Sequence, residues 1–149
     1  MAATAADLVA DATARIRNLT PAQVEAHLLA RDAILLDVRE PDELAEHGRV
    51  ADAVHVPRGQ LEFAADPTSP LHHPALDPAW RTIVYCWLGS RSALSVLALE
   101  SLGYRDVAHL DGGLRAWAAA GLPVVGLAGW HLDAAAGTTA RGRSAGEGW

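Results

Sequence analysis

The sequence predicts an α/β protein in which a central parallel sheet of about five strands has helices on both faces. Short apolar and β-branched runs alternate along the chain with segments that carry helix start signals, and the links between them are short. The run at 33–37 is apolar up to its final Asp37, as expected of a strand that is buried on both faces. Strands that are joined through helices run parallel and are connected by right-handed crossovers.

The expected divisions of the chain are an N-terminal helical extension at 1–18, the domain proper at 19–125 and a Gly- and Ala-rich tail at 126–149. The extension has apolar residues at helical spacing, which predicts a short amphipathic helix over 2–14. The composition of the tail predicts a flexible segment. Trp130 and Trp149 are the exceptions in the tail, and they are candidates for docking on the domain or on another subunit.

The first half of the domain has clear signals for alternating strands and helices. Thr20 is an N-cap, Pro21 suits the first helical position, and Gln23 completes a capping box. Pro57 ends the third apolar run. The expected elements are a strand at 15–19, a helix at 21–30, a strand at 33–37, a helix at 41–47, a strand at 53–56 and a helical turn from Leu61.

The second half begins with a loop at 66–78 that holds four prolines, and we expect this loop to lack regular structure. The next helix is expected to present Leu94, Leu97 and Ala98 to the sheet. Trp117, near the end of the domain, is expected in the core. The expected elements are a strand at 82–85, a helix at 92–102, a strand at 107–110, a tight turn at 111–113 and a helix at 114–119.

Composition excludes several classes of function. The chain has 149 residues, half of them hydrophobic, which suits one domain with a real core. Its net charge of −6 argues against a nucleic-acid binder, and the absence of lysine excludes a Schiff-base lysine and a phosphate-loop lysine. The N-terminus lacks the pattern of a secretory signal, and no stretch reaches the roughly 20 apolar residues of a membrane helix. We therefore expect a cytoplasmic protein without membrane contact.

The sequence predicts no cofactor and no metal site. Cys86 is the only cysteine, which excludes an internal disulfide and a cysteine-rich zinc site. His72 and His73 are adjacent, but neighbouring histidines rarely converge on one ion without further ligands. No supporting Cys, Asp or Glu spacing lies near them.

Cys86 lies between an expected strand and an expected helix. If the helix begins at Ser92, the segment between them wraps around the sulfur and turns its N–H groups inward, at the positive end of the helix dipole. Such a site favours anions and the nucleophilic thiolate form of a cysteine. Arg91, placed just before the helix, adds a positive charge. A lone cysteine is otherwise a small core residue, but Gly89 and Arg91 on a strand-to-helix turn favour a functional role.

Three further charged residues follow strand ends. Asp37 and Arg39 lie at and just past the end of one strand, where Asp37 is expected to form an ion pair or to cap loop N–H groups. Arg58 follows the third strand, at the edge where parallel sheets form their sites. It is a candidate for binding an anionic substrate, with a solvated arginine as the alternative.

Three stretches of the chain resemble the rhodanese-like family of sulfurtransferases. The segment Cys86-Trp87-Leu88-Gly89-Ser90-Arg91-Ser92 is similar to the family's active-site loop, C-x-x-G-x-R-[SA]. The segments at 34–44 and 109–124 are similar to its LLDVREPxE[FY] and LxGGxxxWxxxGxPV motifs, and the three occur in the family's order over about 19–125. The resemblance implies a rhodanese-like fold with Cys86 as the catalytic residue. The other expected site residues are Trp87, Leu88, Gly89, Ser90, Arg91 and Arg58 for substrate binding, and Asp37, Arg39 and Ser92 for support of the site.

The chain departs from the family pattern at 48–53. The family usually carries G-H-I-P-G-A there, whereas this chain has Gly-Arg-Val-Ala-Asp-Ala. Because aspartate tolerates a left-handed backbone better than most residues, we expect Asp52 to occupy the position of the second glycine. The departure concerns the stiffness of this turn and not the Cys86 loop.

The resemblance implies a sulfurtransferase that moves a sulfane sulfur from a donor such as thiosulfate to cyanide or a thiol, through a persulfide on Cys86. One alternative is a persulfide carrier or binding module that serves a partner, such as a sulfur-relay protein, because the apolar Trp87 and Leu88 suit a protein or organic persulfide. A cysteine phosphatase or arsenate reductase is a further alternative. Those enzymes place one more residue between Cys and Arg than the four found here, and the smaller loop favours sulfur. For Arg91, contact with the substrate and pairing with an acid such as Asp37 both remain open.

Overall fold

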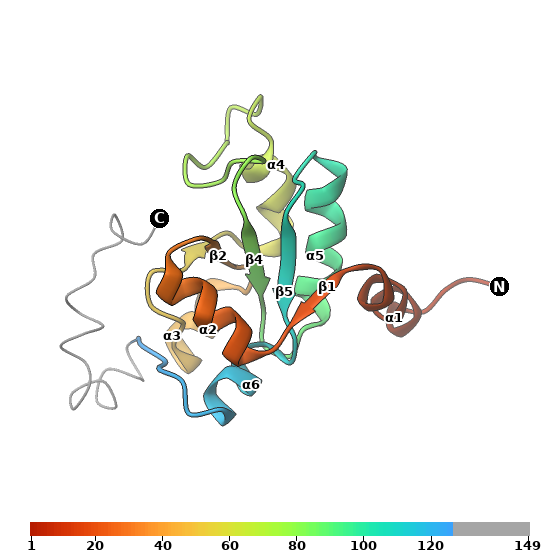
Figure 1. Ribbon diagram of the computed structural model, residues 1–149. Coiled ribbons are helices and arrows are strands. Elements are labelled where there is room, and N and C mark those ends of the chain that lie inside the picture. Colours follow the sequence, from red (N-terminus) through yellow and green to blue (C-terminus); the bar gives the residue numbers. More distant parts are fainter. Residues whose placement is uncertain (127–149) are drawn as a thin grey trace.

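The computed structural model describes residues 1–126, so nearly all of the expected tail, with Trp130 and Trp149, lies outside the described residues. Figure 1 shows the arrangement of the elements. In chain order they are α1 (Ala5–Arg15), β1 (Arg17–Leu19), α2 (Pro21–Ala30), β2 (Ile34–Asp37), α3 (Pro41–His47), β3 (Val54–His55), a 3₁₀ turn (Arg58–Gln60), α4 (Leu61–Ala65), β4 (Thr82–Tyr85), α5 (Ser90–Ser101), β5 (Val107–Leu110) and α6 (Gly113–Ala119).

The five strands form one parallel sheet in the order β1-β5-β4-β2-β3, which confirms the predicted fold class. Every residue of β2, β4 and β5 is buried. The central strand β4 pairs with β2 on one side and β5 on the other, and Asp37 of β2 lies opposite Tyr85 of β4. The residue that follows β4 is therefore surrounded by strand ends of the same edge.

The core is divided by the sheet into two layers. Alternate residues of β4 point to opposite faces, so Val84 and Cys86 belong to one layer and Ile83 and Tyr85 to the other. The first layer is completed by residues of α4 and α5, and the second by residues of α2 and α6. Helix α1 packs against α5 and lies at the side of the molecule (Figure 1).

Local signals predicted several elements well. Helix α2 begins after Thr20, whose side chain accepts a hydrogen bond from the backbone N–H of Gln23 in a capping box. Strand β5 and helix α3 have the expected bounds. Asp52 adopts a left-handed backbone with φ of 65°, which confirms that it takes the glycine-like position.

Helix α5 differs from the prediction in two respects. It begins at Ser90 and not at Ser92, so Arg91 lies in its first turn instead of before it. Leu94, Leu97 and Ala98 were expected to face the sheet but are only partly buried. The buried residues of α5 are Ser92, Ala93, Ser95, Val96 and Leu99. Because α5 packs against α1 as well as the sheet, its apolar residues do not form one stripe that identifies the sheet-facing side.

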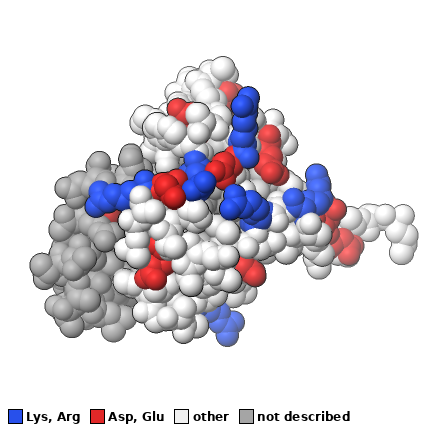
Figure 2. Space-filling view, viewed as in Figure 1, with Lys and Arg blue, Asp and Glu red and all other residues white. Residues whose placement is uncertain are grey.

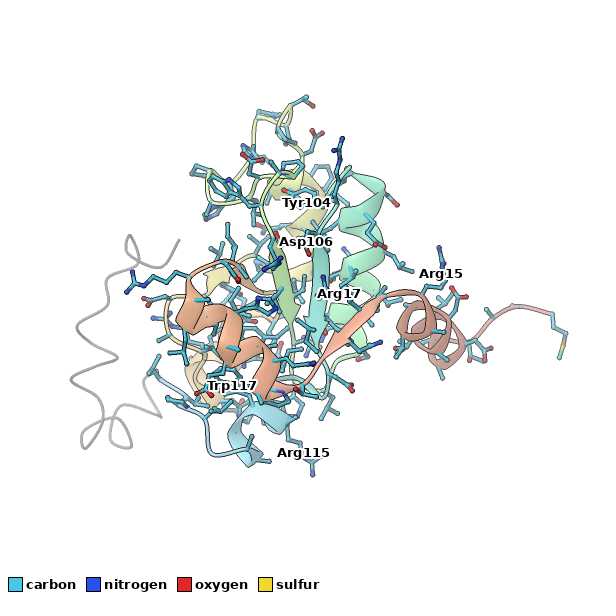
Figure 3. The ribbon with its side chains drawn as sticks, in the orientation of Figure 1. Arg15, Arg17, Tyr104, Asp106, Arg115 and Trp117 are labelled. Atoms are coloured by element: carbon cyan, nitrogen blue, oxygen red, sulfur yellow. The ribbon has the colours of Figure 1, made fainter. Side chains whose placement is uncertain are left out.

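Two aromatic side chains, at opposite ends of the molecule, form hydrogen bonds with backbone carbonyl groups of loops (Figure 3). The hydroxyl group of Tyr104, which follows α5, donates to the carbonyl oxygen of Ala65 at 2.8 Å. The indole N–H of Trp117 in α6 donates to the carbonyl oxygen of Pro123 at 2.8 Å. Trp117 is 3% exposed, which confirms its predicted place in the core.

A buried ion pair fixes the end of β2. The side chains of Arg39 and Asp37 are 0% and 1% exposed, and Arg39 donates to the Asp37 carboxylate through Nε at 3.0 Å and Nη2 at 2.7 Å. Nη2 of Arg39 also donates to the carbonyl oxygen of Gly48 at 2.8 Å, and its guanidinium lies 5.4 Å from the ring centroid of Tyr85. The pair therefore joins β2, the end of α3 and β4.

The surface of residues 1–126 carries charges of both signs. On the face shown in Figure 2, arginine and acidic side chains are interspersed and form no continuous basic patch. Among the helices of the described part, none is both long and apolar enough to cross a membrane.

We expect Arg39→Met to lower the free energy of unfolding by about 3–5 kcal/mol, because it leaves the Asp37 carboxylate buried without its cation. Urea denaturation of the variant measures the loss. The control is Arg15→Met, which removes an ion pair with Asp11 whose two side chains are 59% and 61% exposed. This control should cost at most about 1 kcal/mol. Equal losses in the two variants would contradict a supporting role for the buried pair.

Candidate active site

The Cys86 loop is a very short connection between β4 and α5. Cys86 follows the last residue of β4, and Gly89 is already the N-cap of α5, with φ of 113°. Glycine adopts this left-handed conformation at little cost. Gly89 has no side chain with which to cap the helix, so the first N–H groups of α5 need another acceptor.

The sulfur of Cys86 provides that acceptor. Its Sγ atom accepts hydrogen bonds from the backbone N–H of Gly89 at 3.1 Å and of Ser92 at 3.4 Å, and it lies 3.5 Å from Oγ of Ser92. Ser92 is the third residue of α5, which is the position that an N-cap side chain normally binds. Two N–H donors and the positive end of the α5 dipole thus surround the sulfur, and both favour a negative charge on it.

Helix α6 holds the other side of the loop. The backbone N–H groups of Leu114 and Arg115 donate to the carbonyl oxygens of Cys86 at 2.9 Å and Trp87 at 3.2 Å. These are N–H groups of the first turn of α6, which have no partner within the helix. Gly113 allows this close approach, since a Cβ atom at its position would lie against the backbone of Trp87 and 2.6 Å from the carbonyl oxygen of Cys86.

Arg91 is held by an acid and does not lie free in the loop. Its Nη1 and Nη2 atoms donate to the two carboxylate oxygens of Glu43 in α3, at 2.7 and 2.8 Å. The hydrogen bonds from Arg91 lower the pKa of Glu43 to about 2. Pairing with an acid was one of the two expected roles of Arg91, but the acid is Glu43, because the Asp37 carboxylate is bound by Arg39.

The other side chains of the loop, except the glycine, are less buried than Cys86. The ring of Trp87 stacks on His47 of α3, with 4.9 Å between centroids. Leu88 is 52% exposed and Ser90 is exposed, whereas Cys86 is completely buried. The reactive sulfur is thus covered in this structure, while the loop exposes the side chains of Leu88 and Ser90.

In the part of the chain that the structure describes, the side-chain hydrogen bonds of Arg58, Asp37 and Arg39 go to groups outside the Cys86 loop. The side chain of Arg58 pairs with Glu62 at 2.9 Å, and its backbone N–H donates to the carbonyl oxygen of Val38. Within the described residues, none of the hydrogen bonds of Arg58 goes to the Cys86 loop. Asp37 and Arg39 bind each other beside Tyr85, one residue before Cys86, so a supporting role at the site stays a prediction.

The sequence did not single out His109 and Asn18, which follow Ser92 in a line of contacts that begins at the sulfur. Nδ1 of His109 is 2.9 Å from Oγ of Ser92, and its Nε2 is 2.7 Å from Oδ1 of Asn18. His109 is 2% exposed, and burial lowers its pKa, although the nearby Asp111 carboxylate opposes the shift. A polar residue inside a fully buried strand such as β5 was the available signal for this histidine.

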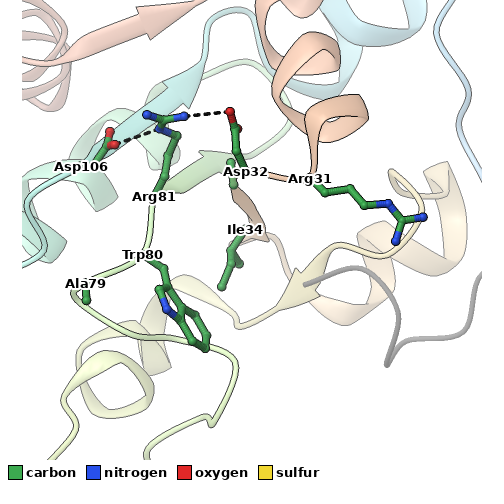
Figure 4. Close-up of a pocket in the computed structure, with 8 residues that line it drawn as sticks. Arg31, Asp32, Ile34, Ala79, Trp80, Arg81 and Asp106 are labelled. Carbon is green, nitrogen blue, oxygen red and sulfur yellow. Dashed lines mark hydrogen bonds and ion pairs between the residues drawn. The ribbon is translucent and has the colours of Figure 1, made fainter.

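A separate cavity of about 440 Å³ lies at the opposite edge of the sheet (Figure 4). Arg81 crosses it and pairs with Asp32 at 3.1 Å and with Asp106 at 2.8 Å. Its other lining residues are Arg31, Ala33, Ile34, Ala79 and Trp80. The cavity lies at the beginnings of β2 and β4, whereas Cys86 follows the end of β4. The cavity is therefore not part of the Cys86 site.

Residues 1–126 contain no cluster of three or more His, Cys, Asp or Glu side chains that could hold a metal ion. The two adjacent histidines of the proline-rich loop bind backbone groups of that loop. Nε2 of His72 lies 2.8 Å from the carbonyl oxygen of Leu76, and Nδ1 of His73 accepts the N–H of Ala75.

Comparison with known proteins places this chain in a family. The sequence model of the rhodanese-like domain matches residues 20–120. An uncharacterized protein of Synechocystis is 37% identical over 100 residues, which cover 66% of this chain and 50% of that protein. A sulfurtransferase of Allochromatium vinosum is 33% identical over 94 residues, which cover 63% of this chain and 79% of that protein. The chain thus spans only half the length of the Synechocystis relative.

A solved structure agrees over a longer stretch. The structure of a protein of unknown function from Rhodopseudomonas palustris, described as a possible tyrosine phosphatase, superposes with a TM-score of 0.79 at 32% sequence identity. The match covers 84% of this chain and 96% of that one.

We expect Gly113→Ala to damage the Cys86 loop, because the added Cβ atom would force α6 away from the loop carbonyls. Gly121→Ala is a matched control, since Gly121 also has a positive φ but has open space around its Cβ position. Gly113→Ala should lower the free energy of unfolding by about 1–3 kcal/mol more than the control. Urea denaturation measures the difference, and equal effects would show that α6 does not set the position of the loop.

Because of the ion pair between Glu43 and Arg91, the free energy of unfolding should decrease as the pH falls in the acid range. The pKa of Glu43 is lowered in the folded state from 4.5 to about 2, so its contribution is complete above about pH 5 and is lost as the pH falls through about 2. At neutral pH we expect the free energy of unfolding of the wild type to be about 2 kcal/mol larger than that of Glu43→Gln, after allowance for solvent screening. Urea midpoints measured at several pH values should converge in acid. A difference that does not change with pH would contradict the assignment.

Proposed function

Because the chain belongs to the rhodanese-like domain family, we propose that it is a sulfurtransferase that carries a sulfane sulfur as a persulfide on Cys86. The observation that supports this most directly is the position of Sγ, which accepts two backbone N–H groups at the start of α5. These donors favour an anionic sulfur before and during the reaction. The sulfurtransferase name of the Allochromatium relative agrees with this chemistry.

The first half of the proposed reaction loads the sulfur. The thiolate of Cys86 attacks the outer sulfur of a donor such as thiosulfate, a new S–S bond forms, and the bond between the two donor sulfurs breaks. The bonding pair leaves with sulfite, and the terminal sulfur of the persulfide carries the negative charge. Because Cys86 is completely buried, this step requires a local opening of the structure around the sulfur.

The second half of the reaction unloads the sulfur. A nucleophilic acceptor, cyanide in an assay or a thiol, attacks the terminal sulfur and releases the Cys86 thiolate. The same N–H groups that bind the sulfur of the resting protein stabilise this leaving thiolate. The loop therefore stabilises negative charge at both stages without a cofactor.

Phosphatase chemistry is the less favoured alternative. A phosphatase of this type needs a guanidinium that faces the oxyanion above the cysteine. Here both Nη atoms of Arg91 are bound by the Glu43 carboxylate, and the acid itself is held by hydrogen bonding from the Glu40 N–H as a helix cap. The charge of Arg91 is thereby partly neutralised and its two Nη atoms are engaged, which disfavours bidentate binding of a phosphoryl group.

A carrier role for a partner protein is the second candidate. It is favoured by Leu88, an exposed apolar side chain two residues after Cys86, and by the neighbouring Trp87 ring. Such a surface suits a protein-bound or organic persulfide as donor or acceptor. In that case small donors would be turned over slowly, although the persulfide on Cys86 would be the same.

Incubation with thiosulfate should add one sulfur atom to the intact mass of the protein, and cyanide should remove it with release of thiocyanate. Cys86→Ser is the control and should gain nothing. A second variant, Arg91→Gln, separates the two enzymatic hypotheses, because it should retain sulfur loading but would abolish phosphatase activity. A free thiol that gains no sulfur from thiosulfate would contradict this donor. Loading by an organic persulfide alone would then support the carrier role.

A further inference from the structure

Three polar side chains, those of Ser92, His109 and Asn18, form a line of contacts that leads from the sulfur of Cys86 to the exposed Asn18 on the edge strand β1. Oγ of Ser92 in α5 lies 3.5 Å from Sγ of Cys86 and 2.9 Å from Nδ1 of His109 in β5. Nε2 of His109 lies 2.7 Å from Oδ1 of Asn18 in β1. The groups come from separate segments of the chain, and the Cys86, Ser92 and His109 residues are 0–2% exposed.

The hydrogen bonds of Asn18 decide which ring nitrogen of His109 carries hydrogen. The Nδ2 group of Asn18 donates to the carbonyl oxygens of Thr13 at 3.0 Å and Ile16 at 3.2 Å. Both of its donor positions are therefore used, and Oδ1 must be the atom that faces His109. Since Oδ1 can only accept, Nε2 of His109 carries a hydrogen in every protonation state of the ring. Only Nδ1 is left to gain or lose a proton.

The same reasoning extends to Ser92. While Nδ1 is unprotonated, it accepts the hydroxyl hydrogen of Ser92, and the oxygen of Ser92 is then free to accept the S–H of Cys86. When Nδ1 is protonated, it donates to Oγ of Ser92, and the hydroxyl hydrogen turns to the sulfur anion or to the carbonyl oxygen of Gly89, 3.1 Å away. The two states differ only in the positions of two protons.

We propose that Ser92 and His109 form a relay that takes the proton of the Cys86 thiol to Nδ1 of His109. In this step the S–H bond breaks and its proton goes to the oxygen of Ser92, while the original hydroxyl proton of Ser92 passes to Nδ1. The products are a thiolate and an imidazolium, and no other reactant is needed. This inference rests on the proposed function, because it explains how a completely buried thiol becomes the nucleophile. His109 does not contact the sulfur: it acts through Ser92, and we therefore class it as a positioning residue.

The charged groups around the relay determine when His109 holds the proton. Burial lowers the pKa of His109, and the Asp111 carboxylate after β5 partly offsets this effect. On the side of α5, Arg91 interacts electrostatically with Cys86 and is itself paired with Glu43 of α3. Because burial disfavours the imidazolium, a sulfur anion formed beside the ring is the charge that stabilises its protonated state.

The relay is tested by following the sulfur and the ring in the same pH titration, without any sulfur donor. The ultraviolet absorbance of the thiolate reports on Cys86, and the nuclear magnetic resonance signals of the imidazole report on His109. In the wild type we expect the two signals to change together. In Cys86→Ser the corresponding change of the His109 signal should disappear. A ring that titrates identically in both proteins would overturn the proposal.

Ser92→Ala should disconnect the two groups. We expect the midpoint of thiolate formation to rise so that roughly tenfold less thiolate is present at a pH below it, and we expect the His109 signal no longer to follow the sulfur. The matched control is Ser95→Ala, which removes another buried hydroxyl of α5 whose bond goes to the carbonyl oxygen of Arg91. Equal titrations in the two serine variants would contradict the relay. If Ser92→Ala does not fold, the comparison of wild type with Cys86→Ser still decides.

Failure of the relay and failure of the sulfurtransferase proposal have different signatures. A protein that gains sulfur from thiosulfate but shows independent titrations of Cys86 and His109 retains the proposed function and has no relay. A protein that shows coupled titrations but gains no sulfur has the relay and lacks the proposed activity.

Discussion

The structure around Cys86 depends on one set of hydrogen bonds. Its sulfur atom accepts the N–H groups that the side chain of an N-cap residue would otherwise bind at the start of α5. This arrangement requires Gly89 in a left-handed conformation, which turns its own N–H toward the sulfur. It also requires β4 and α5 to be joined by a connection of minimal length. The carbonyl groups of the same connection face the opposite way and are bound by α6. The sulfur and two helices are thus positioned by one short segment.

The fold was largely predictable because its signals are local. Thr20, Pro21 and Gln23 lie within four residues of one another and fix the start of α2 without help from the rest of the chain. The alternation of apolar runs and helix starts was sufficient for the parallel sheet. The start of α5 was misplaced because its cap is the side chain of Cys86 and not a residue at the helix end. The sheet-facing side of α5 was misassigned because α1, far away in sequence, also packs against it.

The candidate site was predictable to a similar extent and for the same reason. Cys86, Gly89 and Ser92 are close in sequence, and a resemblance in that segment was enough to place them around the sulfur. The partner of Arg91 was not predictable, since Glu43 lies 48 residues away and Asp37 was an equally reasonable acid until Arg39 was seen to occupy it. His109 was missed because its role depends on the register of β5 beside β4, which the sequence pattern does not supply.

The sulfur that caps α5 also links the chemistry of one atom to the integrity of a secondary structure element. Helix α5 contributes Val96 and Leu99 to the layer of the core that it shares with the sheet. Any reaction that moves negative charge from Sγ to an atom further out weakens an acceptor on which the first turn of this helix relies. We therefore expect the exchange of amide hydrogens at the beginning of α5 to change with the chemical state of the sulfur.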